Sequence, residues 1–201
     1  MTLRGWAVLA AGLLGCAHPA PTPPETAAPA AQAVGHLPES ARYFPLAVGN
    51  RWTYEATYLG EKSTRPVEIV GFRDGSYVDK DGRTLRIDRE GIRDQVRYLL
   101  HEPLNAGATW TSVIAPGSAE HYKIVSVHAP CQVPAGRFPD CIEVESRTLA
   151  DPKTPGRSLV NRVTFASGVG IVQVRTALEE GSKSAPTAEL RLTAFEVAPQ
   201  R

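Results

Sequence analysis

Apolar and polar side chains alternate along most of this chain. Between Trp52 and Tyr58 the apolar side carries Trp, Tyr, Ala and Tyr, and the polar side carries Thr, Glu and Thr. A period of two is typical of a half-buried β-strand, because successive side chains point to opposite faces of the sheet. About ten segments show the pattern. They are 52–58, 67–72, 83–88, 92–100, 110–114, 122–128, 141–147, 159–165, 171–178 and 188–197.

Short turn signals separate these segments, among them Asp74-Gly75, Asp81-Gly82, Glu90-Gly91 and Pro116-Gly117. Loops this short join antiparallel strands, whereas parallel strands need crossovers of about a dozen residues or more. No window of about eleven residues or more shows a helical stripe. The sequence therefore predicts an all-β fold, an antiparallel meander that forms a barrel or half-open barrel, in a single domain over residues 43–201.

The pattern Pro-Leu-x-x-Gly-x-x-Trp occurs twice, at 45–52 and at 103–110. Proline and glycine favour a tight turn, and a tryptophan at the start of the next strand can cover one end of a core. We therefore predict two similar turns with structural roles for Trp52 and Trp110, and we expect Tyr54 and Tyr58 on the same side of the strand as Trp52. An ancient duplication is an alternative origin of the pattern. In a functional alternative, the tryptophans line an opening and contact an apolar or sugar ligand.

The chain begins with a short apolar run that ends in a cysteine. Arg4 is followed by the apolar residues 6–14, and these by Gly15 and Cys16. The run falls well below the ~20 residues that a membrane-spanning helix needs. It resembles the lipobox of a bacterial lipoprotein signal peptide. The resemblance implies cleavage after residue 15, lipid modification of Cys16 and anchoring by several acyl chains. The alternative is an ordinary cleaved signal peptide with a chance cysteine.

Residues 16–42 are rich in proline and alanine and hold almost no large apolar side chain. Such a composition cannot form a core, so we expect a disordered tether between the lipid and the domain. Ala17 stands where a sorting aspartate would follow the lipidated cysteine. In the sorting pattern of Gram-negative lipoproteins, this implies the outer membrane, with the domain in the periplasm or at the cell surface.

The charge of the chain is balanced. It carries 22 Lys+Arg against 21 Asp+Glu, a formal net charge of +1. Removal of the leader takes away Arg4 and no acidic residue, so the mature chain is close to neutral. A neutral chain without a basic run lacks the electrostatic footprint of a nucleic-acid-binding protein. We expect no nucleic-acid partner, and no motif indicates a cofactor.

Cys131 and Cys141 flank a turn that contains Val133-Pro134-Ala135-Gly136. Export would place them in an oxidising compartment, so we predict a disulfide bond between them. A redox or metal pair is the alternative. It is disfavoured because a metal site needs more ligands and because the spacing is unlike Cys-x-x-Cys.

The residue types that most often carry catalysis form no recognisable constellation. His121 and His128 are an odd number of positions apart, so on a regular strand they point to opposite faces and cannot share a metal ion. The sequence has no Gly-x-Ser-x-Gly elbow. Glu143 and Glu145 alternate with apolar residues, which indicates the outer face of the sheet rather than a shared cleft. We expect no metal site and no enzymatic activity.

Three stretches together resemble a scattered family of exported bacterial β-rich lipoproteins of unassigned activity. They are 43–54, with Phe-Pro-Leu and Trp-Thr-Tyr, 133–141, with Val-Pro-Ala-Gly-x-Phe and Cys141, and 168–172, with Gly-Val-Gly-Ile-Val. These are turn and core motifs, so the resemblance implies a fold and no catalytic residue. The expected meander is also loosely similar to the half-open barrels of outer-membrane lipoprotein carriers and receptors, whose concave face binds acyl chains. Those proteins cover the barrel with helices, which this sequence does not predict.

We therefore expect a non-enzymatic, lipid-anchored domain that acts in envelope assembly, adhesion or maintenance through contacts with an envelope protein. The alternative is a carrier or sensor of a hydrophobic, lipid-like ligand, and the third hypothesis is an envelope hydrolase. The interior of the domain distinguishes the first two. A continuous apolar cavity favours a carrier, whereas a filled core favours a scaffold.

Overall fold

The computed structural model describes residues 37–151 and 156–198. The leader, Cys16 and most of the expected tether lie outside these residues. The folded part begins before the expected boundary at 43, because the chain forms a short helix, α1 (Ser40–Tyr43). Ser40 and Ala41 are buried in the domain. The last residues assigned to the tether therefore belong to the fold.

Twelve strands follow α1, which is the only helix in the described part of the chain. The strands are β1 (Arg51–Tyr58), β2 (Glu61–Arg73), β3 (Ser76–Asp79), β4 (Thr84–Asp88), β5 (Gly91–Arg93), β6 (Tyr98–His101), β7 (Thr109–Ala115), β8 (Ser118–Val133), β9 (Gly136–Leu149), β10 (Arg157–Ala166), β11 (Gly170–Glu180) and β12 (Lys183–Glu196). Over the described ranges, no helix has the length and apolar character needed to cross a membrane.

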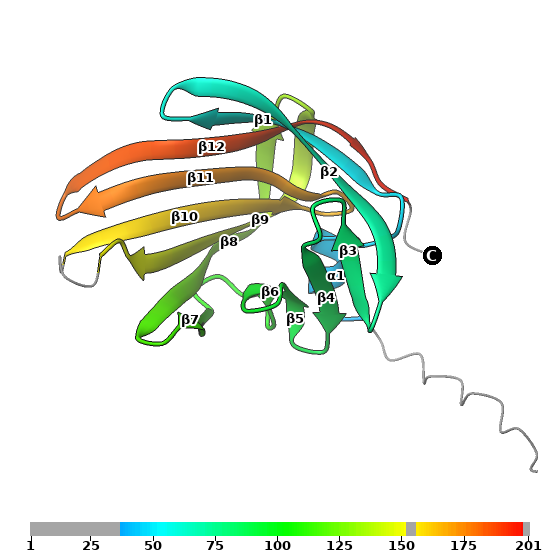
Figure 1. Ribbon diagram of the computed structural model, residues 1–201, viewed down its shortest axis with the longest axis horizontal. Helices are drawn as coiled ribbons and strands as arrows, with labels where there is room; N and C mark the ends of the chain where they lie inside the picture. Colours follow the sequence, from blue (N-terminus) through cyan, green and yellow to red (C-terminus); the bar gives the residue numbers. More distant parts are fainter. Residues whose placement is uncertain (1–36, 152–155, 199–201) are drawn as a thin grey trace, which may run out of the picture. The chain divides into compact units, whose positions relative to one another are not determined.

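All twelve strands belong to one sheet, in the order β6-β5-β4-β3-β2-β1-β12-β11-β10-β9-β8-β7. Each strand pairs with the next one along the chain, with one exception: β6 does not pair with β7. In addition, β1 pairs with β12. The sheet therefore curls into a nearly closed barrel with one seam, between β6 and β7 (Figure 1). This confirms the predicted all-β meander and half-open barrel.

The structure differs from the prediction in its shortest strands. The ten predicted segments do not include β3, although its pairing with β4 confirms the hairpin that the Asp81-Gly82 turn signal indicates. The prediction also treats 92–100 as one strand, whereas the chain reverses there to form β5 and β6. The Asp94 carboxylate accepts hydrogen bonds from the backbone N–H groups of Val96 and Arg97, at 2.8 and 2.7 Å. Aspartate stabilises a turn in this way. This turn is too short to interrupt the alternation of apolar and polar residues, so the sequence predicts a single strand.

The two copies of Pro-Leu-x-x-Gly-x-x-Trp share the turn around their glycine but differ at the proline, since the Glu102–Pro103 peptide bond is cis. Gly49 and Gly107 have φ values of 95° and 89°, a left-handed conformation that favours glycine. The Gly49 N–H donates to the carbonyl oxygen of Ile69, and the Gly107 N–H donates to that of Ile124, both at 2.8 Å. The prediction of two similar turns is confirmed. Each turn precedes one half of the meander, β1–β6 or β7–β12.

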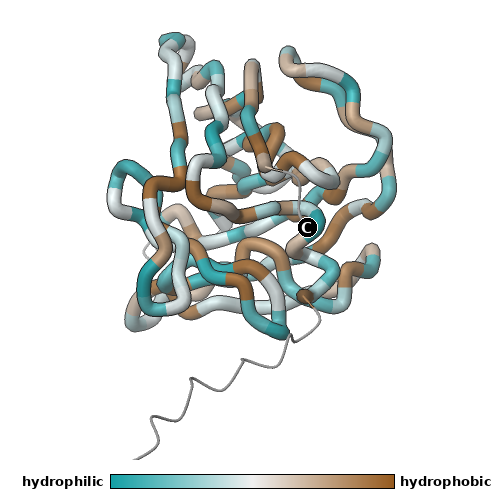
Figure 2. Tube along the Cα trace, turned by 90° about the vertical axis from the view of Figure 1, so that its right-hand side faces the viewer, coloured by the Kyte–Doolittle hydropathy of each residue, from teal (hydrophilic) through white to brown (hydrophobic). Residues whose placement is uncertain are grey.

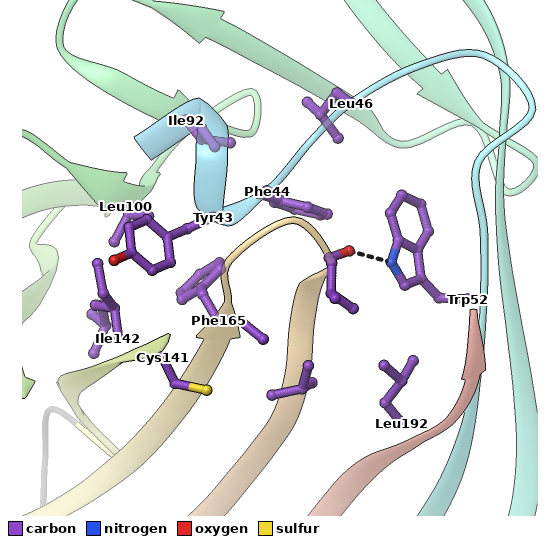
Figure 3. Packing of buried hydrophobic residues seen from close by; sticks show 14 of the residues in the cluster. Tyr43, Phe44, Leu46, Trp52, Ile92, Leu100, Cys141, Ile142, Phe165 and Leu192 are labelled. Carbon is purple, nitrogen blue, oxygen red and sulfur yellow. Dashed lines mark hydrogen bonds between the residues drawn. The ribbon is translucent and has the colours of Figure 1, made fainter. Parts of the chain in front are cut away.

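The main core fills one end of the barrel, where the residues before β1 enter it. Tyr43, Phe44 and Trp52 are buried there. The Phe44 ring packs edge-on against Trp52, with centroids 5.8 Å apart, and lies 6.2 Å from the ring of Phe165. Figure 3 shows these rings together with the aliphatic side chains around them. Because large aromatic side chains bury the most apolar area, this end of the barrel is closed by packing.

The β8–β9 hairpin bends back toward the core. Its register shifts at three places, and the N–H of Ala135 at its tip donates to the carbonyl oxygen of Leu192 in β12, at 2.9 Å. Cys131 and Cys141 form the predicted disulfide bond within this hairpin, with Cα atoms 6.1 Å apart. The hairpin is therefore held both within itself and against β12.

Asp140 joins this hairpin to the segment before β1. Its carboxylate accepts a hydrogen bond from the Tyr43 hydroxyl at 2.8 Å, lies 3.1 Å from His128 Nδ1 and pairs with Arg42. Burial acts to raise the pKa of Asp140, but the hydrogen bonds from Tyr43 and His128 and the charge of Arg42 outweigh it, and the pKa is lowered. The ionised carboxylate therefore helps to hold the segment before β1 against the β8–β9 hairpin at the packed end of the barrel.

The two faces of the sheet differ in chemistry. On the outer face, Arg162 in β10 forms an ion pair with Glu145 in the neighbouring strand β9 at 2.8 Å, and Arg175 in β11 reaches across β10 to Glu143 in β9 at 2.6 Å. Opposite charges on adjacent strands stabilise a sheet. The inner face is mostly apolar, and hydrophobic and hydrophilic residues alternate along the strands in Figure 2. The predicted outward position of Glu143 and Glu145 is confirmed.

Candidate functional site

A cavity of about 640 Å³ lies on the inner face of the barrel, beside the filled end. Its apolar wall is formed by residues of strands β1, β2, β4, β6, β11 and β12. The wall residues are Tyr54, Val67, Leu85, Leu99, Ile171, Val174 and Leu190. Phe44 and Trp52 line the cavity as well. Because these two side chains belong to the core, the packed end of the barrel forms the floor of the cavity.

A second hollow, of about 230 Å³, extends this space toward β8, β9 and β10. The two hollows share the lining residues Arg97, Leu99, Ile171 and Val174. Ligand sites in proteins typically measure about 300–1,000 Å³ and have mostly apolar walls with a few polar groups. The inner face therefore offers two adjoining hollows, of which the larger is of ligand size.

A line of polar side chains crosses the inner face along the second hollow. Glu120 is buried and accepts a hydrogen bond from Ser146 Oγ at 2.6 Å. Asn161 Nδ2 lies 3.5 Å from the same Oγ, and Thr176 Oγ1 donates to Asn161 Oδ1 at 2.9 Å. Arg97 Nη1 lies 3.4 Å from Glu120 Oε2. This line places hydrogen-bonding groups within an otherwise apolar surface.

The tyrosines of the inner face are held in their neutral form. Burial raises the pKa of Tyr54, whose hydroxyl donates to the carbonyl oxygen of Ile171 at 2.9 Å. Burial also raises the pKa of Tyr122, and the hydrogen bond and negative charge of Glu120 raise it further. The site thus presents phenolic hydroxyls rather than phenolates at neutral pH.

The structure separates the four aromatic residues singled out from the sequence. Trp52 and Tyr54 are buried and line the cavity. Trp110 is half-buried at the seam. Tyr58 is 64% exposed, so the alternation that places it on the same side of the strand as Trp52 does not bring it into the core. Tyr58 pairs with Glu61 at the far end of the β1–β2 hairpin, where the strand has run past the core.

Trp110 bridges the two edges of the sheet. Its Nε1–H donates to the carbonyl oxygen of Tyr98 in β6 at 3.0 Å. Its ring stacks on Tyr122, at 5.0 Å between centroids, and on His101, at 5.7 Å. One side chain therefore connects two strands that share no backbone ladder, and these contacts support the structural role predicted for it.

No group of three or more His, Cys, Asp or Glu side chains is placed to hold a metal ion in the described part of the chain. His121 Nδ1 lies 3.0 Å from Thr111 Oγ1. His128 has a φ of 52° and contacts Asp140 instead. The two strand histidines therefore have different partners.

Sequence reasoning missed the residues of the polar line, although each occupies an inward position of its strand. Glu120 stands two residues before the buried Tyr122, and Ser146 stands two residues after the buried Val144. A polar residue in phase with buried neighbours must find hydrogen-bond partners, because burial without them is costly. A polar residue two positions from a buried apolar residue of the same strand is therefore the signal that could have identified Glu120 and Ser146.

A separate hollow of about 510 Å³ lies toward the ends of the hairpins, with Arg162, Arg175 and Glu179 in its lining. Arg162 and Arg175 belong to the ion pairs of the outer face. A ligand there would have to compete with these pairs, so the inner cavity is the better candidate site.

Two solved structures are similar in fold to this chain. No protein-family model matches the sequence, and no curated protein matches it. A protein from Bacteroides fragilis, described as exported and of YmcC-like fold, has a TM-score of 0.47 at 13% identity and covers 76% of this chain and 98% of its own. A protein from Parabacteroides distasonis, described as a lipoprotein, has a TM-score of 0.41 at 12% identity and covers 77% of this chain and 98% of its own. Neither description names an activity.

Proposed function

We propose that this chain is an exported lipoprotein whose β domain binds a hydrophobic or amphiphilic ligand on the inner face of its half-open barrel. The observation that carries the proposal is the cavity of about 640 Å³, with its apolar wall and packed floor. A scaffold gains nothing from an open apolar interior, whereas a carrier or sensor requires one. The cavity therefore favours a binding role over a purely structural one.

The proposed location rests on the sequence. The apolar leader ends at Cys16, and the Cys131–Cys141 disulfide bond suits an oxidising compartment. We infer anchoring at the outer membrane through acyl chains on Cys16, with the domain in the periplasm or at the cell surface. The proline-rich tether would let the domain reach a ligand away from the membrane.

The proposed role is binding without catalysis. The polar side chains at the inner face bond to one another, Ser146 to Glu120 and Thr176 to Asn161. Groups held in this way orient the polar end of a ligand. A hydroxyl that already donates to a buried carboxylate is also fixed in position, which suits recognition.

Binding of a neutral fluorescent probe, N-phenyl-1-naphthylamine, to the purified mature protein tests this proposal. The probe emits more strongly in an apolar site, so the wild-type protein should give saturable binding. Val174→Trp places a large ring in the wall shared by both hollows. This substitution should weaken binding by about tenfold or more, because the added ring occupies ligand space.

Val113→Trp is the matched control, since Val113 is 70% exposed and does not line either hollow. Its affinity for the probe should equal that of the wild type. Thermal unfolding of each variant checks that the fold is retained. If the wild type shows no saturable binding, or if a folded Val174→Trp variant binds as tightly, the proposed ligand site is wrong.

A further inference from the structure

Charged residues gather at two places around the inner cavity. At the first, Arg97 lies 3.0 Å from Asp94 and 3.4 Å from Glu120. One guanidinium therefore faces two carboxylates. The Glu120 side chain is only 4% exposed, so its charge acts in a medium of low dielectric constant, where electrostatic interactions are stronger than in water.

The second place is the β3–β4 turn. Arg83 lies 2.7 Å from Asp79 and 2.9 Å from Asp81. All three residues line the cavity. The Asp79 side chain is 7% exposed and that of Asp81 is 69% exposed. This group therefore runs from the wall of the cavity to its rim.

The charge of the cavity is unbalanced. Its lining, taken over the described residues of both hollows, contains no lysine or histidine and two arginines, Arg83 and Arg97. Against them stand four carboxylates, those of Asp79, Asp81, Asp94 and Glu120. Each group thus has a formal charge of −1 at neutral pH. An anionic ligand head would meet repulsion from the excess carboxylates, whereas a cationic head would balance them.

We propose that the ligand of this cavity is a cationic amphiphile. Its ammonium or guanidinium head lies beside Glu120 and Asp94, and its apolar body lies against Leu99, Ile171 and Val174. This inference rests on the proposed function and adds the charge of the ligand. The arrangement suits such a ligand because Arg97, in the turn before β6, and Leu99, in β6, both border both hollows.

The test compares three probes with the same dodecyl chain and different heads, each below its micelle concentration. They are dodecyltrimethylammonium, which is cationic, dodecanoate, which is anionic, and dodecyl maltoside, which is neutral. Each probe competes with N-phenyl-1-naphthylamine for the mature protein at low salt. Dodecyltrimethylammonium should bind about tenfold or more tightly than dodecanoate. Added salt should reduce this preference, because it screens the charges near the rim.

Two variants assign the preference to the carboxylates. Glu120→Gln keeps the shape of the side chain and removes its charge, so it should lower the preference for the cationic probe severalfold. Asp81→Asn changes an exposed rim residue and is not expected to affect folding; it should lower the preference about twofold. Glu143→Gln is the matched control, because Glu143 pairs with Arg175 on the outer face, and it should leave the preference unchanged.

The outcomes separate this inference from the proposed function. If dodecanoate or dodecyl maltoside binds as tightly as dodecyltrimethylammonium, the cationic assignment is wrong and the ligand site remains. If both Asp81→Asn and a folded Glu120→Gln keep the full preference, the carboxylates do not recognise the head and the assignment is again wrong. If no probe displaces the fluorophore and the fluorophore itself does not bind, the proposed function fails as well. Should Glu120→Gln fail to fold, Asp81→Asn alone decides.

Discussion

The indole N–H of Trp52 donates a hydrogen bond of 2.7 Å to the carbonyl oxygen of Val169, 117 positions further along the chain (Figure 3). The bond connects the start of β1 to the turn between β10 and β11. The same indole packs against Phe44, which arrives from the segment before β1. One buried side chain therefore holds three parts of the chain together and forms part of the cavity floor.

Trp52→Ala should lower the free energy of unfolding by about 3–5 kcal/mol, as truncation of a large core residue commonly does. Trp52→Phe keeps much of the apolar volume but leaves the Val169 carbonyl without its partner, so it should have a smaller effect, about 1–3 kcal/mol. Trp110→Ala should also destabilise the domain, by less than Trp52→Ala because Trp110 is only half-buried. Urea unfolding measures all three, and unchanged stability in both alanine variants would rule out their structural role.

Asp140→Asn should destabilise the domain in a way that depends on pH. The pKa of Asp140 is lower in the folded chain than the ~3.9 of an unperturbed aspartate. Its ionised form therefore stabilises the fold above that value, and this contribution is lost as the pH falls through the lower folded pKa. We expect a deficit of about 1–2 kcal/mol at neutral pH, from the lost charge-assisted hydrogen bonds.

The deficit of Asp140→Asn should shrink below pH ~4, because the carboxyl of the unfolded wild-type chain is protonated there and that of the folded chain follows at its lower pKa. Urea unfolding of both proteins at neutral and acidic pH gives the comparison. An equal deficit at both pH values would show that shape, and not charge, is what Asp140 contributes.

Loss of the Cys131–Cys141 bond should destabilise the β8–β9 hairpin. A loop of this length contributes roughly 2–3 kcal/mol in the chain-entropy model. The double variant Cys131→Ala/Cys141→Ala should therefore unfold at lower urea concentration than the oxidised wild type and should match the reduced wild type closely. Mass spectrometry of a non-reduced digest tests the bond itself, and free thiols at both positions in protein from its native compartment would refute the pairing.

Cys16→Ser should abolish lipid anchoring. The variant cannot accept an acyl group at the position that ends the leader, so an unprocessed or soluble protein is expected. Fractionation of cell envelopes and the intact mass of the mature chain measure the change. Ala17→Ser, next to it, should leave processing and fractionation as in the wild type. Full recovery of Cys16→Ser with the outer membrane would mean that another feature holds the protein there.

The sequence by itself determined the longer strands and the way they connect. The alternation from Trp52 onward and the short glycine turns specify antiparallel neighbours, because side-chain direction and loop length are local properties. The paired turns at Gly49 and Gly107 and the bond between Cys131 and Cys141 could be predicted for the same reason, since each depends on residues close together in the chain.

The cavity and its charged groups were decided only by the tertiary structure. Alternation says that Glu120 and Ser146 point inward, but not that they meet each other, 26 positions apart, or that Arg97 reaches Glu120 from a turn 23 positions away. Nor does it say where the inner face is filled and where it stays open, so it could not show that Tyr58 lies outside the core. These outcomes depend on how far the sheet curls and what it curls around, and that curvature arises from the packing of all twelve strands together.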